Sequence, residues 1–229
     1  MNEFKVIRGG KVGTGLLIEG DAGFIEPNDI RNKPFVTEIG KIGKGTVMVE
    51  PLILFVVLQK YGVENKNGRI YPEHILKREA INYQELINSR SAVGESDHPE
   101  SSVISNSRVS HEIKKIWWEG RTLVGEIEII MSPGFINQGI ISCEGDNIAN
   151  FLRKGIRVGV SSRGVGSLEE IAGKLLVQDD FELICWDIVT SPSTPGSYMF
   201  NSKSEAQPFM ESEEKGKDLL IDNLNKFLI

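Results

Sequence analysis

The sequence is short of the residues that disulfides and metal sites require. Among 229 residues it has two cysteines and three histidines, and Cys143 and Cys185 lie far apart, outside any CxxC pair. This pattern indicates neither a disulfide framework nor a zinc site. We expect two buried, reduced thiols in an intracellular protein.

Long apolar runs and clusters of basic residues are also missing. The longest apolar run, residues 51–58, is far too short to span a bilayer, and the first residues lack the apolar region of a signal peptide. The net charge is −6 and the basic residues are scattered, so we expect neither membrane contact nor direct nucleic-acid binding. Residues 40–46 fail as a phosphate loop because neither Ser nor Thr directly follows Gly43-Lys44. We expect no cofactor and no metal.

What is present fits one large domain with appendages. At 229 residues the chain is long enough to bury a substantial core. Its content of 40 % apolar and 25 % charged residues is ordinary for a soluble protein. Residues 1–45 are rich in glycine and turn residues and predict a loosely structured arm with one short strand. Residues 46–200 carry the regular patterns of a domain. Residues 201–229 predict a polar linker followed by a short amphipathic helix at the C-terminus, with an apolar side of Leu220, Leu224, Phe227 and Leu228.

Strand and helix patterns follow one another within the domain segment. Residues 47–59 are almost continuously apolar and predict a strand buried on both faces. Pro72 suits the first position of a helix over residues 73–88. Residues 107–118 and 121–130 alternate with period two and predict a hairpin. The apolar stripe of the helix consists of Leu76, Ala80, Tyr83 and Ile87.

Further elements follow toward the C-terminal half. Asp146 is placed to cap a short helix that closes at Gly155. Residues 174–190 predict one or two strands. The whole pattern amounts to at least five strands and three helices.

The most chemically suggestive run is residues 159–166, Gly-Val-Ser-Ser-Arg-Gly-Val-Gly. Aliphatic residues alternate with polar or small ones up to Val160, which predicts a strand with Ser161 pointing away from the aliphatic face and Ser162 pointing with it. A hydroxyl at the strand end, beside glycine amides and Arg163, supplies a nucleophile and donors for an oxyanion. The alternative is a polar strand end followed by a glycine turn, with no chemistry.

Of the three histidines, His98 lies in the best place for a function. It belongs to the polar loop of residues 94–100, and functional residues concentrate in such loops. His98 could be a general base for a serine, a metal ligand, or a surface residue. We expect His74 on the surface of its helix and His111 packed within a strand. The carboxylates that could complete a metal site with His98 are Glu95, Asp97 and Glu100.

Asp187 is a lone carboxylate within the apolar residues 181–189. Taking a carboxylate out of water is costly without a partner. A histidine that becomes cationic during catalysis would be a suitable partner. The alternative is a bond to local backbone or to an arginine.

Five segments carry a family resemblance because they follow one another in a fixed order. They are residues 65–72 (NKNGRIYP), 94–99 (GESDHP), 117–118 (WW), 159–164 (GVSSRG) and 187–193 (DIVTSPS). In these segments the chain resembles the prohead (procapsid) core serine proteases of contractile-tailed bacteriophages. That family is similar to the herpesvirus maturation protease, assemblin. The resemblance covers about residues 50–200.

The resemblance implies an α+β fold, with a mainly antiparallel sheet or barrel surrounded by helices, and a serine endopeptidase activity. The family's histidine falls on His98 and its serine on Ser161. Assemblins use a second histidine as third member, but no histidine follows Ser161 here, so we assign that role to Asp187. The expected support for the oxyanion comes from Ser162, Arg163 and Gly164.

The resemblance also implies partners and a place of action. Such proteases act inside the prohead, in the host cytoplasm, on scaffold and prohead core proteins, on the major capsid protein precursor and on themselves. They cut after a glutamate that stands two residues past an aliphatic residue. Residues 17–20, Leu-Ile-Glu-Gly, fit this rule and predict self-cleavage after Glu19; residues 168–170, Leu-Glu-Glu, fit it as well.

Two alternatives belong to other functional classes. One is an inactive structural or scaffold-binding protein of the prohead core, in which Ser161 is unreactive. The other is a metal-dependent hydrolase that uses His98, Glu95 and Asp97. A chelator would silence the hydrolase, whereas a serine-directed acylating reagent would not.

Overall fold

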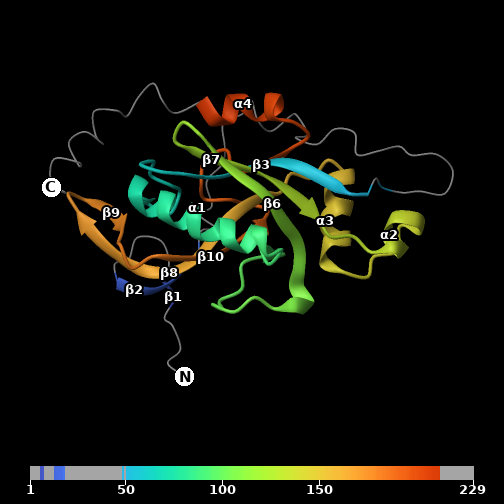
Figure 1. Ribbon diagram of the computed structural model, residues 1–229, viewed down its shortest axis with the longest axis horizontal. Coiled ribbons are helices and arrows are strands. Elements are labelled where there is room, and N and C mark those ends of the chain that lie inside the picture. The colour runs from blue at the N-terminus through green and yellow to red at the C-terminus, as the bar shows by residue number, and fades with distance from the viewer. Residues whose placement is uncertain (1–5, 8–12, 19–47, 49, 212–229) are drawn as a thin grey trace.

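The described strands form two mainly antiparallel sheets. A computed structural model describes residues 6–7, 13–18, 48 and 50–211. The first sheet has six strands, in the order β1-β2-β8-β9-β4 with β10 also paired to β8, and the second has five, in the order β11-β3-β7-β6-β5 (Figure 1). The strands are β1 Val6–Ile7, β2 Gly13–Ile18, β3 Leu52–Lys60, β4 Arg69–Ile70, β5 Val93–Glu95, β6 Val109–Glu119, β7 Thr122–Ile129, β8 Gly159–Ile171, β9 Lys174–Val177, β10 Glu182–Val189 and β11 Met199–Phe200.

Helices cover these strands. Helix α1 packs on β6 and β10, α3 packs on β6 and β7, and α4 packs on β3 and β11. In Figure 1, α4 lies on the opposite side of the molecule from β1 and β2. No helix in the described ranges is long and apolar enough to cross a membrane. The helices are α1 Glu73–Asn88, α2 Pro133–Gln138, α3 Glu144–Arg153 and α4 Lys203–Glu211, with a 3-10 turn at Asn106–Arg108.

The two sheets are joined at both edges. Ser96, which follows β5, forms a bridge to Ile188 of β10, and Gly159 of β8 forms a bridge to Tyr198 beside β11. The strands therefore form a barrel-like ring around one main core. That core contains residues of both sheets, such as Val56 of β3 in the second sheet and Val160 of β8 in the first. The α+β fold with mainly antiparallel strands and surrounding helices is confirmed.

Several predicted elements are confirmed, although some of their bounds differ. Helix α1 covers residues 73–88. Leu76, Ala80 and Tyr83 of its stripe are buried, and Ile87 is partly buried. Strands β6 and β7 form the predicted hairpin, and residues 174–190 contain β9 and β10. Strand β3 is buried on both faces apart from Ile53, although it begins at Leu52 and not at residue 47. These elements follow their apolar periods because burial imposes those periods.

The predicted polar linker contains a helix. Helix α4 packs Ala206 and Met210 into a cluster with Phe55 and Phe200. Two apolar side chains one turn apart are enough to dock a short helix, and the polar residues around them hide the pattern. The predicted C-terminal amphipathic helix lies outside the described residues.

Two other local predictions need correction. Asp146 occupies the third position of α3 and Cys143 is its N-cap residue, because the Asp146 carboxylate accepts the Cys143 N–H at 3.1 Å. Within residues 1–45, where we expect one strand, the structure has both β1 and β2. Strand β2 pairs along its whole length with β8.

Candidate active site

The serine-bearing segment is a continuous strand and does not end in glycines. Strand β8 begins at Gly159 and continues through Gly164 and Gly166 to Ile171. A Cβ on Gly164 would lie 2.5 Å from a ring atom of Phe181, and a Cβ on Gly166 would lie 2.8 Å from Phe181 Cα. The two glycines are therefore required by the close approach of Phe181. The prediction that the strand ends at these glycines is wrong, and so is the alternative of a glycine turn.

The register between β8 and β10 separates the two serines. Ser161 lies directly opposite Asp187, and Ser162 lies opposite Trp186. Directly opposed side chains of an antiparallel pair share a face, so Ser161 and Asp187 share one face while Ser162 faces the main core with Trp186. Arg163 lies on the Asp187 side because it is two residues from Ser161. Ser161 is 2 % exposed.

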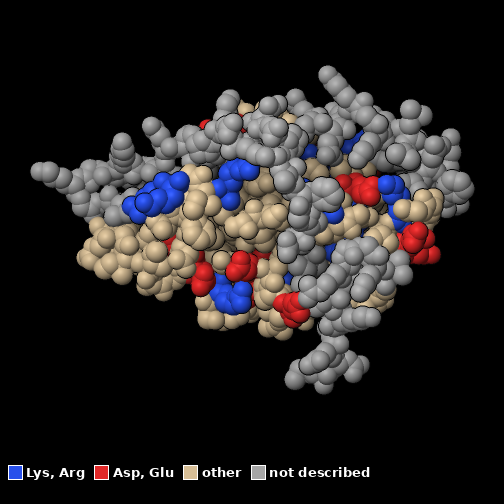
Figure 2. All heavy atoms as spheres, turned by 180° about the vertical axis from the view of Figure 1, so that it is seen from behind, with Lys and Arg blue, Asp and Glu red and all other residues tan. Residues whose placement is uncertain are grey.

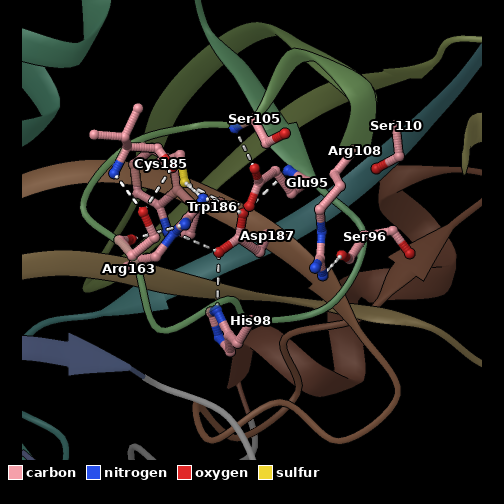
Figure 3. Close-up of polar contacts among 12 residues, drawn as sticks. Glu95, Ser96, His98, Ser105, Arg108, Ser110, Arg163, Cys185, Trp186 and Asp187 are labelled. Carbon is pink, nitrogen blue, oxygen red and sulfur yellow. Dashed lines mark hydrogen bonds and ion pairs between the residues drawn. The ribbon is translucent and has the colours of Figure 1, made fainter. Parts of the chain in front are cut away.

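His98 reaches Asp187 from the loop that follows β5. The loop turns at Asp97, whose φ of 67° is a left-handed conformation that aspartate tolerates better than most residues. The Asp97 N–H donates to the Ile188 carbonyl at 2.9 Å and holds the loop on β10. Nδ1 of His98 lies 2.9 Å from Oδ2 of Asp187, and the imidazole is 8 % exposed (Figure 3).

Asp187 is fully buried and has several donors. Oδ1 accepts from the Glu95 backbone N–H at 3.0 Å and from Arg163 at 3.2 Å, and Oδ2 also lies 2.9 Å from Arg163 Nε. The Cys185 thiol donates to Oδ1 at 3.3 Å. Burial raises the pKa of a carboxyl group, but the hydrogen bond and charge of His98, together with Arg163, lower the pKa of Asp187 overall. A histidine, an arginine and the backbone thus all bind this carboxylate.

Arg163 and Glu95 are both fully buried and contact each other. Arg163 donates to the Glu95 carboxylate at 3.0 Å and to the Ser101 carbonyl at 2.9 Å, and Glu95 accepts the Ser105 N–H. Glu95 belongs to strand β5, not to the predicted loop. The guanidinium that we expect at the oxyanion thus lies between Glu95 and Asp187 (Figure 3). In the part of the chain that the structure describes, no three His, Cys, Asp or Glu side chains are placed to hold a metal ion.

The backbone expected to form the oxyanion site lies inside the sheet. Ser162, Arg163 and Gly164 are paired with β10. Arg163 and Gly164 also lie opposite Ile18 and Leu17 of β2. An oxyanion site that uses these amides therefore depends on the position of β2.

The candidate nucleophile and the candidate base each have a buried polar atom without a hydrogen-bond partner among the described residues. These atoms are Nε2 of His98 and Oγ of Ser161. Such atoms are rare because an unpaired buried polar group is costly. Ser162 Oγ is also unpaired, but it lies on the core side of the strand.

The other histidines and the cysteines have structural surroundings. His74 is exposed on α1. His111 is buried in β6, 2.9 Å from the Trp186 carbonyl, and burial lowers its pKa to about 4. Both placements are as predicted. Cys185 is a buried free thiol, whereas Cys143 is only partly buried at the start of α3, which corrects the prediction of two buried thiols.

The contact between Glu95 and Arg163 is not predicted from the sequence. Each of them stands close to a candidate catalytic residue, because Glu95 is three residues before His98 and Arg163 is two residues after Ser161. A catalytic histidine and serine must lie close together in the fold. Residues of opposite charge beside each of them could therefore have been predicted to form an ion pair. Local periodicity cannot show it, because the two residues are 68 positions apart.

The surface charge in Figure 2 is mixed. Small groups of acidic and basic side chains alternate over the described residues of this face. Together with a net charge of −6, this distribution does not resemble the basic stripe of a nucleic-acid-binding surface.

Comparisons with known proteins agree with the fold. A family model described as prohead core protein serine protease matches residues 16–214. The chain is 28 % identical over 179 residues to the prohead core protein protease of Enterobacteria phage T4. The aligned segment covers 77 % of this chain and 81 % of the relative. The structure of the bacteriophage T4 capsid assembly protease, gp21, is similar with a TM-score of 0.59 at 27 % identity, over 78 % of this chain and 99 % of that chain. Because the family model spans most of the sequence, this chain belongs to the prohead core protein serine proteases.

Proposed function

We propose that this protein is a serine endopeptidase of the phage prohead in which Ser161 is the nucleophile, His98 the general base and Asp187 the residue that orients His98. One observation carries this proposal. Asp187 contacts His98 at 2.9 Å and lies directly opposite Ser161 in the β8–β10 pair. The imidazole is thus brought to the strand face that carries the serine hydroxyl.

The geometry suggests how the proton moves. A His98 ring that donates from Nδ1–H to Asp187 has its lone pair on Nε2. Nε2 takes the proton of Ser161 Oγ while Oγ forms a bond to the carbonyl carbon of the substrate. The imidazolium gives that proton to the amine as the C–N bond breaks. Water then attacks the acyl carbon while Nε2 takes a proton from the water. The imidazolium gives this proton to Ser161 Oγ as the ester C–O bond breaks and the acid product leaves. Asp187 stabilises the imidazolium in both steps.

The oxyanion needs hydrogen-bond donors, but the backbone after Ser161 is already paired within the sheet. Amides of Ser162 and Gly164 are the candidates, because they follow the nucleophile along β8. Strand β2 lies beside Gly164, so donors on that side become available when β2 moves or when a substrate strand takes its place.

The family supports substrates among the proteins of the prohead. We infer that the protease acts inside the prohead, in the host cytoplasm, on scaffold and core proteins and on the major capsid protein precursor. Cleavage after glutamate, two residues past an aliphatic residue, is the specificity that the resemblance implies. No cofactor takes part in these steps.

Self-cleavage after Glu19 is supported by the position of β2. Leu17 is fully buried and packs with Tyr71 and Phe181, as an aliphatic side chain of a bound substrate would. Ile18 lies opposite Arg163, two residues from Ser161, and Glu19 is the next residue of the chain. Extended peptides commonly bind proteases and other partners by adding a strand to a sheet.

The test compares the wild-type protein with Ser161→Ala and Ser162→Ala by intact-mass analysis after incubation alone. The two serines are neighbours on opposite faces of β8 and are both buried, so Ser162→Ala is a matched control. We expect fragments that end in glutamate, including one that ends at Glu19, in the wild type and in Ser162→Ala. Ser161→Ala should show none, with an unchanged circular-dichroism spectrum.

Other outcomes separate the alternatives. Loss of cleavage only in Ser162→Ala would move the nucleophile to the core face and contradict the register argument. If no sample shows fragments, the same three proteins are incubated with scaffold protein, and an intact scaffold would favour an inactive structural protein. Activity that a chelator removes would support a metal-dependent hydrolase.

A further inference from the structure

We propose that Glu95 and Arg163 are positioning residues that set the charge Asp187 presents to His98. The proposal rests on the function proposed above, in which His98 is the base. It assigns Arg163 to the support of the acid–base pair and not to direct contact with the oxyanion.

The arrangement places one guanidinium between two carboxylates. Arg163 lies 3.0 Å from the Glu95 carboxylate on one side, and 2.9 Å and 3.2 Å from the two Asp187 oxygens on the other. The three side chains are fully buried. A planar guanidinium can hold two carboxylates in fixed orientation, which an ammonium group cannot do.

The charges of this cluster leave one negative charge for His98. If Asp187 were paired with Arg163 alone, the guanidinium would cancel its charge, and an imidazolium would gain little from the pair. Glu95 satisfies part of the Arg163 charge, so the cluster of two carboxylates and one guanidinium keeps one negative charge. When His98 accepts a proton, the buried cluster becomes neutral, and this favours the imidazolium that the reaction forms.

The other titratable groups around Asp187 do not alter this balance. Cys185 of β10 and Tyr83 of α1 stay neutral because burial raises the pKa of both groups well above their usual values. His111 of β6 stays neutral near pH 7 because burial lowers its pKa to about 4. The charged groups that face the pair from β5, β8 and β10 are therefore Glu95, Arg163 and Asp187.

The same pair fixes the loop that carries His98. Arg163 binds the Ser101 carbonyl, and Glu95 binds the Ser105 N–H. Ser101 and Ser105 lie after His98, in the loop between β5 and β6. The pair therefore ties β8 to the loop and limits how far the imidazole can move from Asp187.

Opposite charge changes should move the reaction in opposite directions. Glu95→Gln removes a negative charge, so the imidazolium is disfavoured and the acidic limb of the kcat/KM profile should move to lower pH. Arg163→Gln removes a positive charge, so the limb should move to higher pH. We expect a displacement of about half a pH unit or more in each case. Arg163→Lys keeps the charge but loses the fork, so kcat should fall with little displacement.

The measurement is cleavage in trans of a peptide that contains a Leu-Ile-Glu-Gly site, over a pH series, with folding of each variant checked by thermal melting. Glu112→Gln is the control, because Glu112 is a β6 carboxylate paired with Arg90 and Lys114 and not with Arg163 or His98. Its acidic limb should coincide with that of the wild type. Limbs of Glu95→Gln and Arg163→Gln that both stay in place, or both move in one direction, would contradict the proposal.

A second measurement does not depend on activity. The chain has three histidines, so the ring signals of His98 can be assigned by NMR in the Ser161→Ala background and titrated with and without each charge change. Opposite displacements of that titration support the positioning role even if cleavage is lost in a variant. A Ser161→Ala protein that still cleaves the peptide would instead overturn the proposed function, and the two failures are thus distinguishable.

Discussion

His111 should make the protein lose stability in mild acid by a calculable amount. The side chain is fully buried in β6, with Nε2 2.9 Å from the Trp186 carbonyl, and burial lowers its pKa from 6.5 to about 4. The unfolded chain therefore binds a proton at higher pH than the folded protein does. Stability falls as the pH drops below about 6.5, and the loss levels off near pH 4. Between about pH 7.5 and about pH 4.5 this contribution amounts to about 2 to 3 kcal/mol.

The assay is urea unfolding of the wild type, His111→Gln and His74→Gln at these two pH values. A glutamine amide can still donate to the Trp186 carbonyl but does not titrate. Carboxylates that lose their partners in acid, such as Asp187, affect all three proteins equally, so the difference between proteins isolates the histidine. We expect His111→Gln to lose about 2 to 3 kcal/mol less than the wild type. His74 is exposed, and its variant should follow the wild type. Equal losses in all three proteins would refute the reasoning.

Two further predictions concern stability and are measured by urea unfolding at neutral pH. Gly94→Ala places a Cβ 2.2 Å from the Trp186 carbonyl and 2.5 Å from His111 Nε2, and should cost roughly 3 kcal/mol or more. Gly173→Ala is the control: its Cβ meets no atom within 4 Å but the residue keeps a φ of +76°, so it should cost only about 1 kcal/mol. Similar losses of stability in Gly94→Ala and Gly173→Ala would contradict a steric clash at Gly94. Asp146→Ala leaves three backbone N–H groups, now bonded at 2.7 to 3.1 Å, without an acceptor. It should cost roughly 3 kcal/mol, and a loss below 1 kcal/mol would contradict this.

Elements with a regular apolar period are the ones that the sequence predicts well. Helix α1 and the β6–β7 hairpin bury one face each, so their side chains repeat at 3.6 or 2 residues. Helix α4 is not predicted because two buried apolar side chains hold it among polar ones. The glycines of β8 are misinterpreted for a related reason. A glycine that allows Phe181 to approach closely looks the same in sequence as a glycine that allows a turn.

The site is predictable in its residue types but not in its contacts. His98 and Asp187 are recognisable because a polar loop histidine and a carboxylate in an apolar run are both unusual, and the family order places them. Their contact spans 89 positions, and that of Glu95 with Arg163 spans 68. Such contacts depend on how β5, β8 and β10 are brought together, and this is a property of the barrel-like ring and not of any segment.

The buried charges bear on whether the protein is active or only structural. Burying Glu95, Arg163 and Asp187 costs desolvation, and apolar side chains of similar volume often stabilise a core as well or better. A purely structural domain gains nothing from the negative charge that this cluster retains. In a protease that charge stabilises the imidazolium that the reaction forms, because His98 contacts Asp187. The cluster therefore favours an active enzyme, and it does so through residues other than the nucleophile.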